Sequence, residues 1–325
     1  MEVYSGCHFL WMLLLQCCRF YIVSAQLTLS AYDLFKMCSD GRGIVVLKDY
    51  IRLLRVKHYI KNTLVFLPLF FGIELFDGKK LCSTFFGFVC FCLLSSSIYI
   101  INDYRDIDKD RNHPTKKNRP LASGRIKPQA AFAVLAICLI GVIAISYYLG
   151  SLSGFVCLAL YFALNVAYSM GLKNIPIIDI VILASGFVIR VFYGGFISGL
   201  AISNWLYLVV TTGSMYMGLG KRRNELNGST ESREVLKYYN VNFLDRNMYV
   251  CVALTDVFYA LWTLEFVNGV VRWTVPAFII IMMRYSLDIE GNSDGDPVEV
   301  ILKDKILIAM AVLYAVCFFS MLYIF

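Results

Sequence analysis

Four aspartates lie close together in the segment 102–110, whose sequence is Asn-Asp-Tyr-Arg-Asp-Ile-Asp-Lys-Asp, and three of them are spaced to share one side of a helix. If one helix runs through this segment, Asp103, Asp106 and Asp110 lie at positions i, i+3 and i+7 and share one face. Carboxylates stacked in this way repel one another unless a cation gathers them. Mg²⁺ prefers oxygen ligands and usually binds through one or two carboxylates together with substrate phosphates. The segment therefore indicates a site where a metal ion and a phosphorylated substrate meet.

An acidic loop balanced by its own Lys and Arg is the alternative interpretation. The segment directly follows a long apolar stretch, where charge is costly, and this position favours the metal and phosphate site. The next segment, 118–125, reads Asn-Arg-Pro-Leu-Ala-Ser-Gly-Arg. Arg119 and Arg125 could hold phosphates through paired hydrogen bonds, or could belong to a basic loop that contacts anionic lipid. The sequence of this segment alone leaves both possibilities open.

The elements that must position these residues are embedded in a membrane. Of the 325 residues, 59% are hydrophobic and 16% are charged, whereas soluble domains contain about 25% charged residues. A spanning helix needs about 20 mostly apolar residues, and helices satisfy their own backbone in lipid. We therefore expect an all-α polytopic membrane protein with about nine transmembrane helices. The expected spans are roughly 63–77, 81–101, 129–149, 152–170, 177–199, 203–219, 248–268, 272–287 and 306–325.

The connections between the expected spans alternate in character. One set is short and poor in charge: 78–80, 150–151, 200–202 and 269–271. The other set is longer and charged: 102–128, 171–176, 220–247 and 288–305. Cytoplasmic loops carry an excess of Lys and Arg, so we expect the charged loops, and with them the polar chemistry, on the cytoplasmic face.

We expect one transmembrane catalytic domain, 46–325, preceded by an N-terminal extension, 1–45. The extension contains an apolar stretch from Phe9 to Leu15, so a signal peptide or membrane anchor is possible. The interpretation that we favour is an extension without catalytic importance, with Met37 as an alternative start.

Cysteine usage and net charge exclude further classes. The 11 Cys form no Cys-x-x-Cys pair, and with only three His the chain has no zinc-ligand spacing. The net charge of +7 in so apolar a chain indicates basic cytoplasmic loops that face membrane lipids and phosphorylated substrates, rather than nucleic acid.

The aspartate pattern and the following Arg-Pro-Leu-Ala-Ser-Gly resemble the UbiA superfamily of intramembrane prenyltransferases. Other segments are similar to its decaprenyl-phosphate phosphoribosyltransferase branch, and the similarity runs from about residue 48 to the C-terminus. The matching segments are 55–62, Tyr168-Ser169 with Leu172-Lys173, Asp179 with Gly186-Phe187 and Arg190, 220–226, and Arg284-Tyr285 with Asp288.

The resemblance implies a nine-helix bundle with a lateral cavity open to lipid, in which Mg²⁺ on aspartate-rich motifs binds a diphosphate. The branch transfers phosphoribose from phosphoribosyl diphosphate to a polyprenyl phosphate. Asp103, Asp106 and Asp110 would then be metal ligands and, with Lys221, catalytic residues. The substrate-binding residues would be Lys61, Asn62, Asn102, Arg119, Tyr168, Lys173, Asp179, Arg190, Arg222 and Glu225. The partners would be these two substrates and membrane lipids, with a homo-oligomer allowed.

The sequence departs from the wider superfamily in segment 221–225, where prenyl-diphosphate users typically carry a second Asp-x-x-x-Asp motif. Here the segment is Lys-Arg-Arg-Asn-Glu, which offers fewer metal ligands and more direct phosphate contacts, or alternatively a positive-inside anchor. A prenyltransferase that uses a prenyl diphosphate donor is the nearer alternative function. A transporter or non-catalytic lipid-binding protein is the more distant one, and it would leave the stacked aspartates unexplained.

Asp179 and Arg190 are two ionisable residues inside one expected span. They are eleven residues apart, about three helical turns, and so share a face. Ionisable residues within a membrane are functional candidates by default. A buried ion pair across helices is the competing explanation, and Asp179 could instead bind a second metal ion or a ribose hydroxyl.

Overall fold

The computed structural model describes residues 41–227, 233–265, 269–291, 300–301 and 303–323. Most of the predicted extension 1–45 lies outside the described residues, which begin within helix α2. All regular elements in this part of the chain are helical, as the sequence predicts. The α-helices are α2 (Gly41–Leu54), α3 (Leu67–Phe71), α4 (Gly78–Arg105), α5 (Ile107–Asn112), α6 (Pro128–Leu149), α7 (Leu152–Met170), α8 (Ile178–Ser198), α9 (Asn204–Asn227), α10 (Val241–Thr263), α11 (Val275–Glu290) and α13 (Lys305–Tyr323). The 3-10 helices are η1 (Val56–Phe66), η2 (Lys116–Asn118), η3 (Leu172–Asn174), η4 (Glu234–Tyr238) and η5 (Val271–Thr274).

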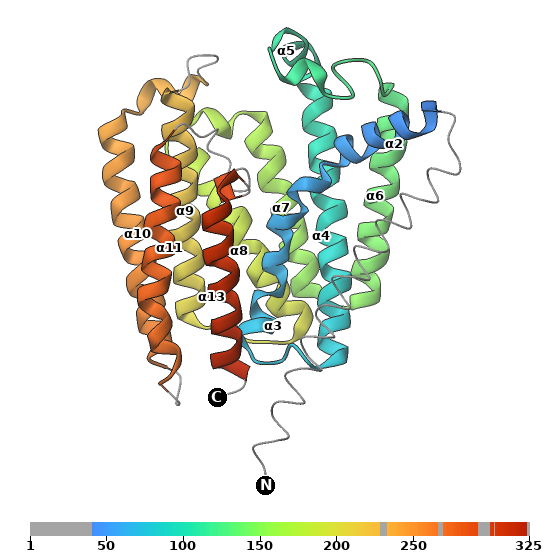
Figure 1. The fold of residues 1–325 in the computed structure, drawn as a ribbon. Coiled ribbons are helices and arrows are strands. Elements are labelled where there is room, and N and C mark those ends of the chain that lie inside the picture. Colours follow the sequence, from blue (N-terminus) through green and yellow to red (C-terminus); the bar gives the residue numbers. More distant parts are fainter. Residues whose placement is uncertain (1–40, 228–232, 266–268, 292–299, 302, 324–325) are drawn as a thin grey trace.

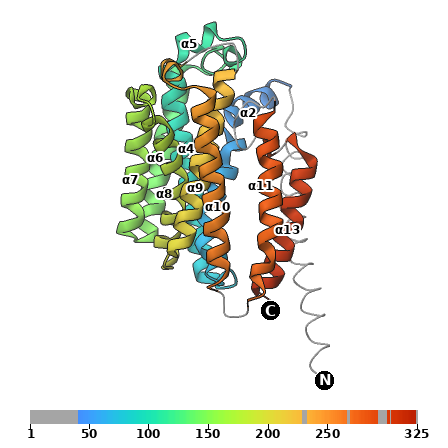
Figure 2. The same cartoon turned by 90° about the vertical axis from the view of Figure 1, so that its left-hand side faces the viewer.

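The long helices run side by side as one bundle (Figure 1). Seen from the side, α5 and α2 lie at the same end of the bundle (Figure 2). Five described helices are long and apolar enough to cross a membrane: α4, α6, α7, α8 and α13. The chain is therefore an integral membrane protein, although the predicted number of nine spans is not established.

The first predicted span, 63–77, does not form one helix. It is divided between the end of η1, the short α3 and the residues before α4. Pro68 opens α3 and Gly72 follows its last residue, and a Pro interrupts the helical hydrogen bonds of the preceding turn. Each of the other eight predicted spans overlaps one long helix.

Side-chain caps fix where several helices begin. The Asp77 carboxylate accepts hydrogen bonds from the backbone N–H groups of Lys79 and Lys80, at 2.9 and 3.1 Å, where α4 starts. Ser151 caps α7 and Asn240 caps α10 in the same way. These bonds satisfy amides that have no partner within the helix.

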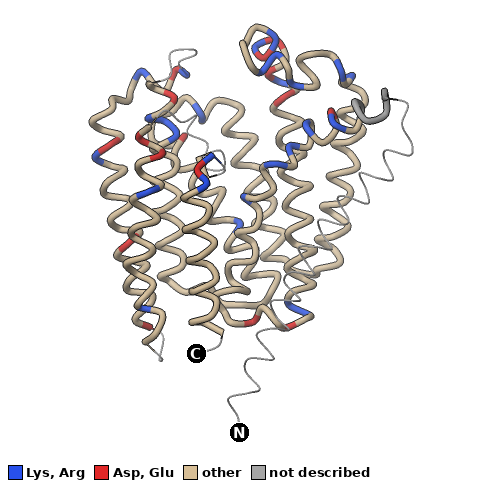
Figure 3. Tube along the Cα trace, viewed as in Figure 1, with Lys and Arg blue, Asp and Glu red and all other residues tan. Residues whose placement is uncertain are grey.

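Charged residues gather at one end of the bundle (Figure 3). That end carries the end of α4, α5 and η2, whereas the middle of the bundle is almost uncharged. The charged loops predicted from the sequence therefore lie together in space. A charge is expensive to bury in lipid, so the polar chemistry must take place at this end.

Close packing between α8 and η1 places η1 against the bundle. A Cβ atom on Gly194 would lie 2.0 Å from the carbonyl oxygen of Val65, which is far inside contact distance. The absence of a side chain at Gly194 therefore allows the backbone of η1 to approach α8. The segment η1 also carries Lys61 and Asn62, two of the predicted substrate-binding residues.

We expect Gly194→Ala to push η1 away from α8 and to lower the free energy of unfolding by about 1–3 kcal/mol, as for other overpacked sites. Thermal unfolding in detergent would measure this loss. Gly213→Ala is the matched control, because its Cβ would meet Thr255 at an ordinary 3.6 Å. Equal melting temperatures for the two variants would contradict the proposed role of Gly194.

Candidate active site

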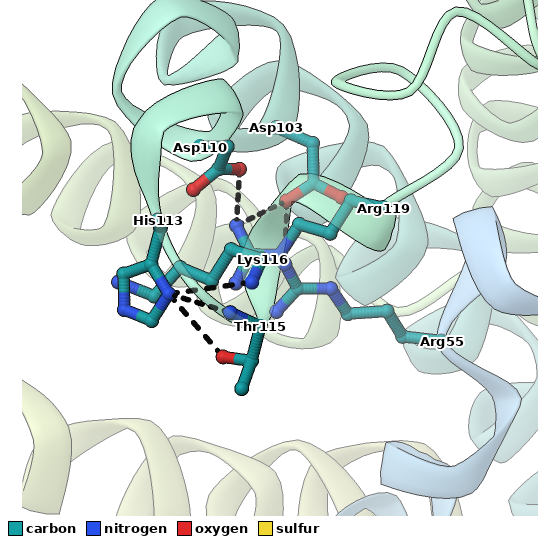
Figure 4. Close-up of polar contacts among 7 residues, drawn as sticks. All are labelled: Arg55, Asp103, Asp110, His113, Thr115, Lys116 and Arg119. Carbon is teal, nitrogen blue, oxygen red and sulfur yellow. Dashed lines mark hydrogen bonds and ion pairs between the residues drawn. The ribbon is translucent and has the colours of Figure 1, made fainter.

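A network of carboxylates and guanidinium groups lies at the charged end of α4 (Figure 4). Arg119 donates through Nη1 to Asp103 Oδ1 at 3.1 Å and to Asp110 Oδ2 at 2.7 Å. Arg55 donates through Nη2 to the same Asp103 oxygen at 2.5 Å. The two carboxylates are almost fully buried, whereas the two arginines stay partly exposed. Tertiary contacts thus join the aspartate segment to Arg119, as well as to an arginine from the end of α2.

The continuous helix assumed for the three aspartates is not present. Helix α4 ends at Arg105, Asp106 is the next residue, and α5 begins at Ile107. The Asp106 N–H still bonds to the Asn102 carbonyl, and the Asp110 N–H bonds to the Asp106 carbonyl. The chain therefore bends at Asp106, yet all three aspartates face one cavity.

This cavity, which we call the carboxylate cavity, has a volume of about 440 Å³. It is lined by six basic and four acidic side chains, along with several neutral polar groups. Seven of the predicted site residues line it: Asn102, Asp103, Asp106, Asp110, Arg119, Tyr168 and Lys173. Such a mixture of charges suits a ligand that carries several anionic groups and a cation.

The donor set fits a hard divalent cation in part. Carboxylate oxygens are what Mg²⁺ prefers, and one or two of them with substrate phosphates suffice. Arg119 contacts both Asp103 and Asp110, so these carboxylates reach a common point. In the described part of the chain, however, no three His, Cys, Asp or Glu side chains are close enough to hold a metal ion. The residues thus fit a metal that is shared with a bound phosphate, and they do not form a complete metal site by themselves.

A second polar cluster is centred on Arg222, whose side chain is fully buried. Its Nε donates to Asp179 Oδ2 at 2.5 Å, Nη1 donates to Glu225 Oε2 at 2.5 Å, and Nη2 donates to the Tyr168 hydroxyl at 2.9 Å. The Tyr239 hydroxyl donates to the other Asp179 oxygen at 2.6 Å. All three guanidinium nitrogens of Arg222 therefore have protein partners.

Asp179 thus lies in a buried ion pair across helices, one of the two possibilities that the sequence left open. Arg222 and Asp179 come from α9 and α8, and neither lines the carboxylate cavity. The assignment of both residues to substrate binding stays a prediction, and the contacts in this structure pair them with other protein groups.

Glu225, Tyr168 and Arg233 connect this cluster to the carboxylate cavity. Arg233 donates to the Tyr168 hydroxyl at 2.8 Å and lies 3.5 Å from Glu225 Oε2. Arg233 and Tyr168 both line the cavity. Burial acts to raise the pKa of Glu225, but the neighbouring guanidinium groups of Arg222 and Arg233 outweigh it and lower that pKa.

Lys221 lies next to these residues, beyond the apolar segment 203–219. Burial lowers the pKa of its amine to about 8, Glu225 opposes this shift, and the nearby Arg222 and Lys61 add to it. A lysine whose pKa lies near neutral pH titrates within the working range of a protein, and such perturbed groups often belong to functional sites.

Arg190 and Asn62 bind each other inside the bundle, and the hydrogen-bond partners of the Arg190 guanidinium group are neutral oxygen atoms. Arg190 donates through Nε to Asn62 Oδ1 at 2.8 Å and through Nη2 to the Tyr161 hydroxyl at 2.9 Å. Its guanidinium group also lies over the Phe91 ring, 4.7 Å from the centroid. Arg190 and Asp179 share α8 but have separate partners, so the structure does not bring these two together.

Two contributors to the site were not identified from the sequence. Arg55 belongs to the segment 55–62 that carries the resemblance, but only its contact with Asp103 indicates a role. Arg233 lies in a charged loop without any motif, and only its position beside Tyr168 distinguishes it. The backbone of Arg55 is left-handed, with φ of 53°, a conformation that costs about 1–3 kcal/mol in a residue with a side chain.

An apolar cavity of about 290 Å³ lies among α8, α9, α10, α11 and α13. Its wall includes Leu64 on η1 and Met217 on α9. Lys61 is three residues from Leu64 in a 3-10 helix, and Lys221 is four residues from Met217 in an α-helix. These spacings put each lysine on the same side of its helix as its apolar neighbour, and the two lysines are close enough for the charge of Lys61 to act on Lys221.

Arg284 and Asp288, which also carry the resemblance, line a different cavity of about 370 Å³. Arg284 donates through Nε to Asp304 Oδ2 at 2.6 Å. The pKa of Asp288 is raised, first by burial and then by the neighbouring Asp304. This group is therefore separate from the carboxylate cavity.

A bundle of membrane helices with a strongly charged cavity at one end is typical of membrane proteins that bind anionic substrates. The UbiA prenyltransferase family model matches residues 65–220. A decaprenyl-phosphate phosphoribosyltransferase of Mycolicibacterium smegmatis is 35% identical over 79% of this chain and 87% of its own length. A protein of the same name from Corynebacterium glutamicum is 32% identical, over 84% and 86%.

The chain belongs to the UbiA prenyltransferase family, and its resemblance to the phosphoribosyltransferase branch is confirmed. A solved structure of a UbiA homolog from Archaeoglobus fulgidus, bound to DMAPP and Mg²⁺, has the same fold. Its TM-score is 0.65 at 20% identity, and the match covers 85% of this chain and 98% of that one. The protein is thus an integral membrane transferase.

We expect Arg222→Met to destabilise the fold by about 3–5 kcal/mol, because it leaves the Asp179 carboxylate buried without its cation. Thermal unfolding in detergent measures the loss. The neighbouring Arg223 supplies the control, since its pair with Asp245 is partly exposed and Arg223→Met should cost much less. A loss for Arg222→Met no larger than that for Arg223→Met would refute the central role of the buried pair.

Proposed function

We propose that this protein transfers 5-phosphoribose from phosphoribosyl diphosphate to a polyprenyl phosphate and releases pyrophosphate. The observation that carries this proposal is the carboxylate cavity, which places three aspartates and six basic side chains around one space at the charged end of a membrane bundle. The names of the relatives support the same reaction. Phosphoribosyl diphosphate carries phosphate groups at both ends of its ribose. Basic side chains would bind these phosphates, and the carboxylates would bind the Mg²⁺ ion that accompanies the diphosphate.

In this proposal the donor diphosphate binds at Asp103, Asp106 and Asp110, with a Mg²⁺ ion shared between these carboxylates and the phosphates. When bound, the ion would neutralise charge that builds up on the departing pyrophosphate. Binding of the diphosphate would draw Arg119 and Arg55 from the carboxylates toward the phosphate oxygens, because guanidinium groups bind phosphate in paired hydrogen bonds. The solved relative bound to DMAPP and Mg²⁺ supports a divalent ion in this family.

The lipid acceptor would place its tail in the apolar cavity and its phosphate near Lys61 and Lys221. An oxygen of that phosphate attacks the anomeric carbon of the ribose. The bond between this carbon and the diphosphate oxygen breaks, and its electron pair leaves with pyrophosphate. The acceptor is already ionised at neutral pH, so no general base is required. Positioning of the two substrates and stabilisation of charge in the transition state supply the catalysis.

We further propose that the charged end of the bundle faces the cytoplasm, since basic loops are retained on that side.

The second candidate function is transfer of a prenyl group from a prenyl diphosphate donor to an aromatic or other acceptor. The family name favours it, and the segment 221–225, with three cations and one carboxylate, favours phosphoribosyl transfer. Assembly into a homo-oligomer stays a prediction.

A donor competition assay tests the proposed function. Labelled phosphoribosyl diphosphate and labelled prenyl diphosphate would be offered separately to purified protein with Mg²⁺, polyprenyl phosphate and a phenolic acceptor. We expect label from phosphoribosyl diphosphate to enter the lipid fraction, and EDTA to stop the transfer. Label moving only from prenyl diphosphate would establish the second candidate instead.

We expect Asp106→Asn to lower kcat/KM for phosphoribosyl diphosphate at least about hundredfold, because one ligand for the metal and diphosphate is lost. Asp106 is suited to this test because it has no ion pair within the described residues, so its change leaves the arginine network intact. Asp108→Asn is the control, since the Asp108 side chain is 96% exposed. Similar, mild losses in both variants would remove Asp106 from the site.

The lowered pKa of Lys221 predicts a pH dependence for acceptor binding. The protonated amine attracts the acceptor phosphate, and its charge is lost as pH rises through about 8. We therefore expect kcat/KM for polyprenyl phosphate to fall above this pH, since this ratio reports the free enzyme. In Lys221→Arg the guanidinium stays charged, and the decline should move to higher pH. An unchanged profile in that variant would show that another group titrates.

A further inference from the structure

A second polar cavity of about 270 Å³ adjoins the carboxylate cavity. Six residues line both, among them Asn102, Asp106 and Lys173, so the two spaces are continuous. The second cavity is bounded by the end of α4, the end of α7 and η3. We call it the annex. Arg233 and Tyr168 line the carboxylate cavity but not the annex, and Tyr168 contacts Arg222 on α9.

The annex is rich in cations. Arg105, Lys109 and Lys173 line it, together with the amides of Asn102 and Asn174. Within the described part of the chain, none of these three cations forms an ion pair with a carboxylate. The contrast with Arg55, Arg119 and Arg222 is clear, because each of those is bound to an aspartate. The annex thus offers positive charge that the protein itself does not neutralise, next to a carboxylate, Asp106, that belongs to both cavities.

The opposite side of the carboxylate cavity has a different neighbour. There Arg233 and Glu225 adjoin Lys221, which follows Met217 of the apolar cavity by about one turn of α9. An acceptor whose tail is held in the apolar cavity reaches the carboxylate cavity from this side. Its phosphate therefore meets Lys61 and Lys221, and leaves the annex to the other substrate.

We propose that the annex is the subsite for the 5-phosphate of the donor, with Lys173, Lys109 and Arg105 as its cations. This assignment rests on the proposed function and deepens it. With the diphosphate at the aspartates, the ribose lies across the boundary between the two cavities, so its anomeric carbon faces the acceptor side and its 5-phosphate the annex. The subsite also sets specificity. A prenyl diphosphate has no group that carries charge into the annex, so its binding does not benefit from these cations.

Two inhibitors that each represent one end of the donor test the assignment. Ribose 5-phosphate carries the phosphate without the diphosphate, and pyrophosphate carries the diphosphate without the ribose. We expect Lys173→Met to weaken inhibition by ribose 5-phosphate, and to raise KM for phosphoribosyl diphosphate, by about tenfold, the loss typical of one charge-assisted hydrogen bond. Inhibition by pyrophosphate and KM for polyprenyl phosphate should stay as in the unaltered protein. Lys109→Met should show the same selective pattern.

Lys127→Met is the matched control, because Lys127 is an exposed lysine at the start of α6 that lines neither cavity. It should alter neither inhibition constant. Equal weakening of both inhibitors in Lys173→Met would assign Lys173 to the diphosphate instead, and a raised KM for polyprenyl phosphate alone would assign the annex to the acceptor. If the unaltered protein transfers no phosphoribose, the proposed function and this subsite both fail. If it transfers phosphoribose and Lys173→Met behaves like Lys127→Met, only the subsite fails.

Discussion

The buried ion pair between Arg222 and Asp179 is the interaction on which the charged end of the bundle depends. It joins α9 to α8, and through the Tyr168 hydroxyl it also reaches α7. An uncompensated charge in such a place costs several kcal/mol, so the helices must meet in the one arrangement that pairs both groups. That arrangement sets Glu225 and Tyr168 beside Arg233 at the edge of the carboxylate cavity. A contact that lines neither the carboxylate cavity nor the annex thus helps to set where the groups at the cavity wall lie.

The cost of a buried unpaired charge also distinguishes two pairs of arginines in this protein. Arg222 and Arg190 are buried, and each of their guanidinium nitrogens has a partner in the protein. Arg55 and Arg119 bind carboxylates from partly exposed positions at a cavity wall. The first kind holds helices together inside the bundle, while the second kind can exchange a carboxylate for a phosphate without leaving an unpaired charge behind. Of these four arginines, only Arg55 and Arg119 are therefore placed to exchange partners with a ligand.

The apolar cavity and the two polar cavities offer different environments to the two proposed substrates. In the proposed arrangement, the apolar space among α8, α9, α10, α11 and α13 is followed by Lys61 and Lys221, then by the carboxylate cavity and by the cationic annex that adjoins it. A lipid phosphate and a phosphorylated sugar differ in where they carry apolar surface and charge, and this order separates them in the same way. The two substrates can approach the aspartates from opposite sides, which places the reacting atoms between them and leaves each tail or phosphate in a suitable environment.

The amino-acid sequence was sufficient to predict the fold class, the family and the gathering of charge at one end of the bundle. Apolar stretches long enough to span a bilayer permit only helices, and the aspartate segment with Arg119 specifies the superfamily. It also identified seven of the fifteen residues that line the carboxylate cavity, because those seven lie in motifs with short spacing. The partners of Arg222, Asp179, Arg190 and Asn62 became known from the three-dimensional structure, because they come from other helices. Arg55 and Arg233 were found in the same way. The break at Asp106 and the division of segment 63–77 depend on packing at the helix ends, where local periodicity carries little information. Spacing along one helix predicts which residues share a face of that helix. Which faces of two helices pack against each other depends on how the whole bundle pairs its buried charges.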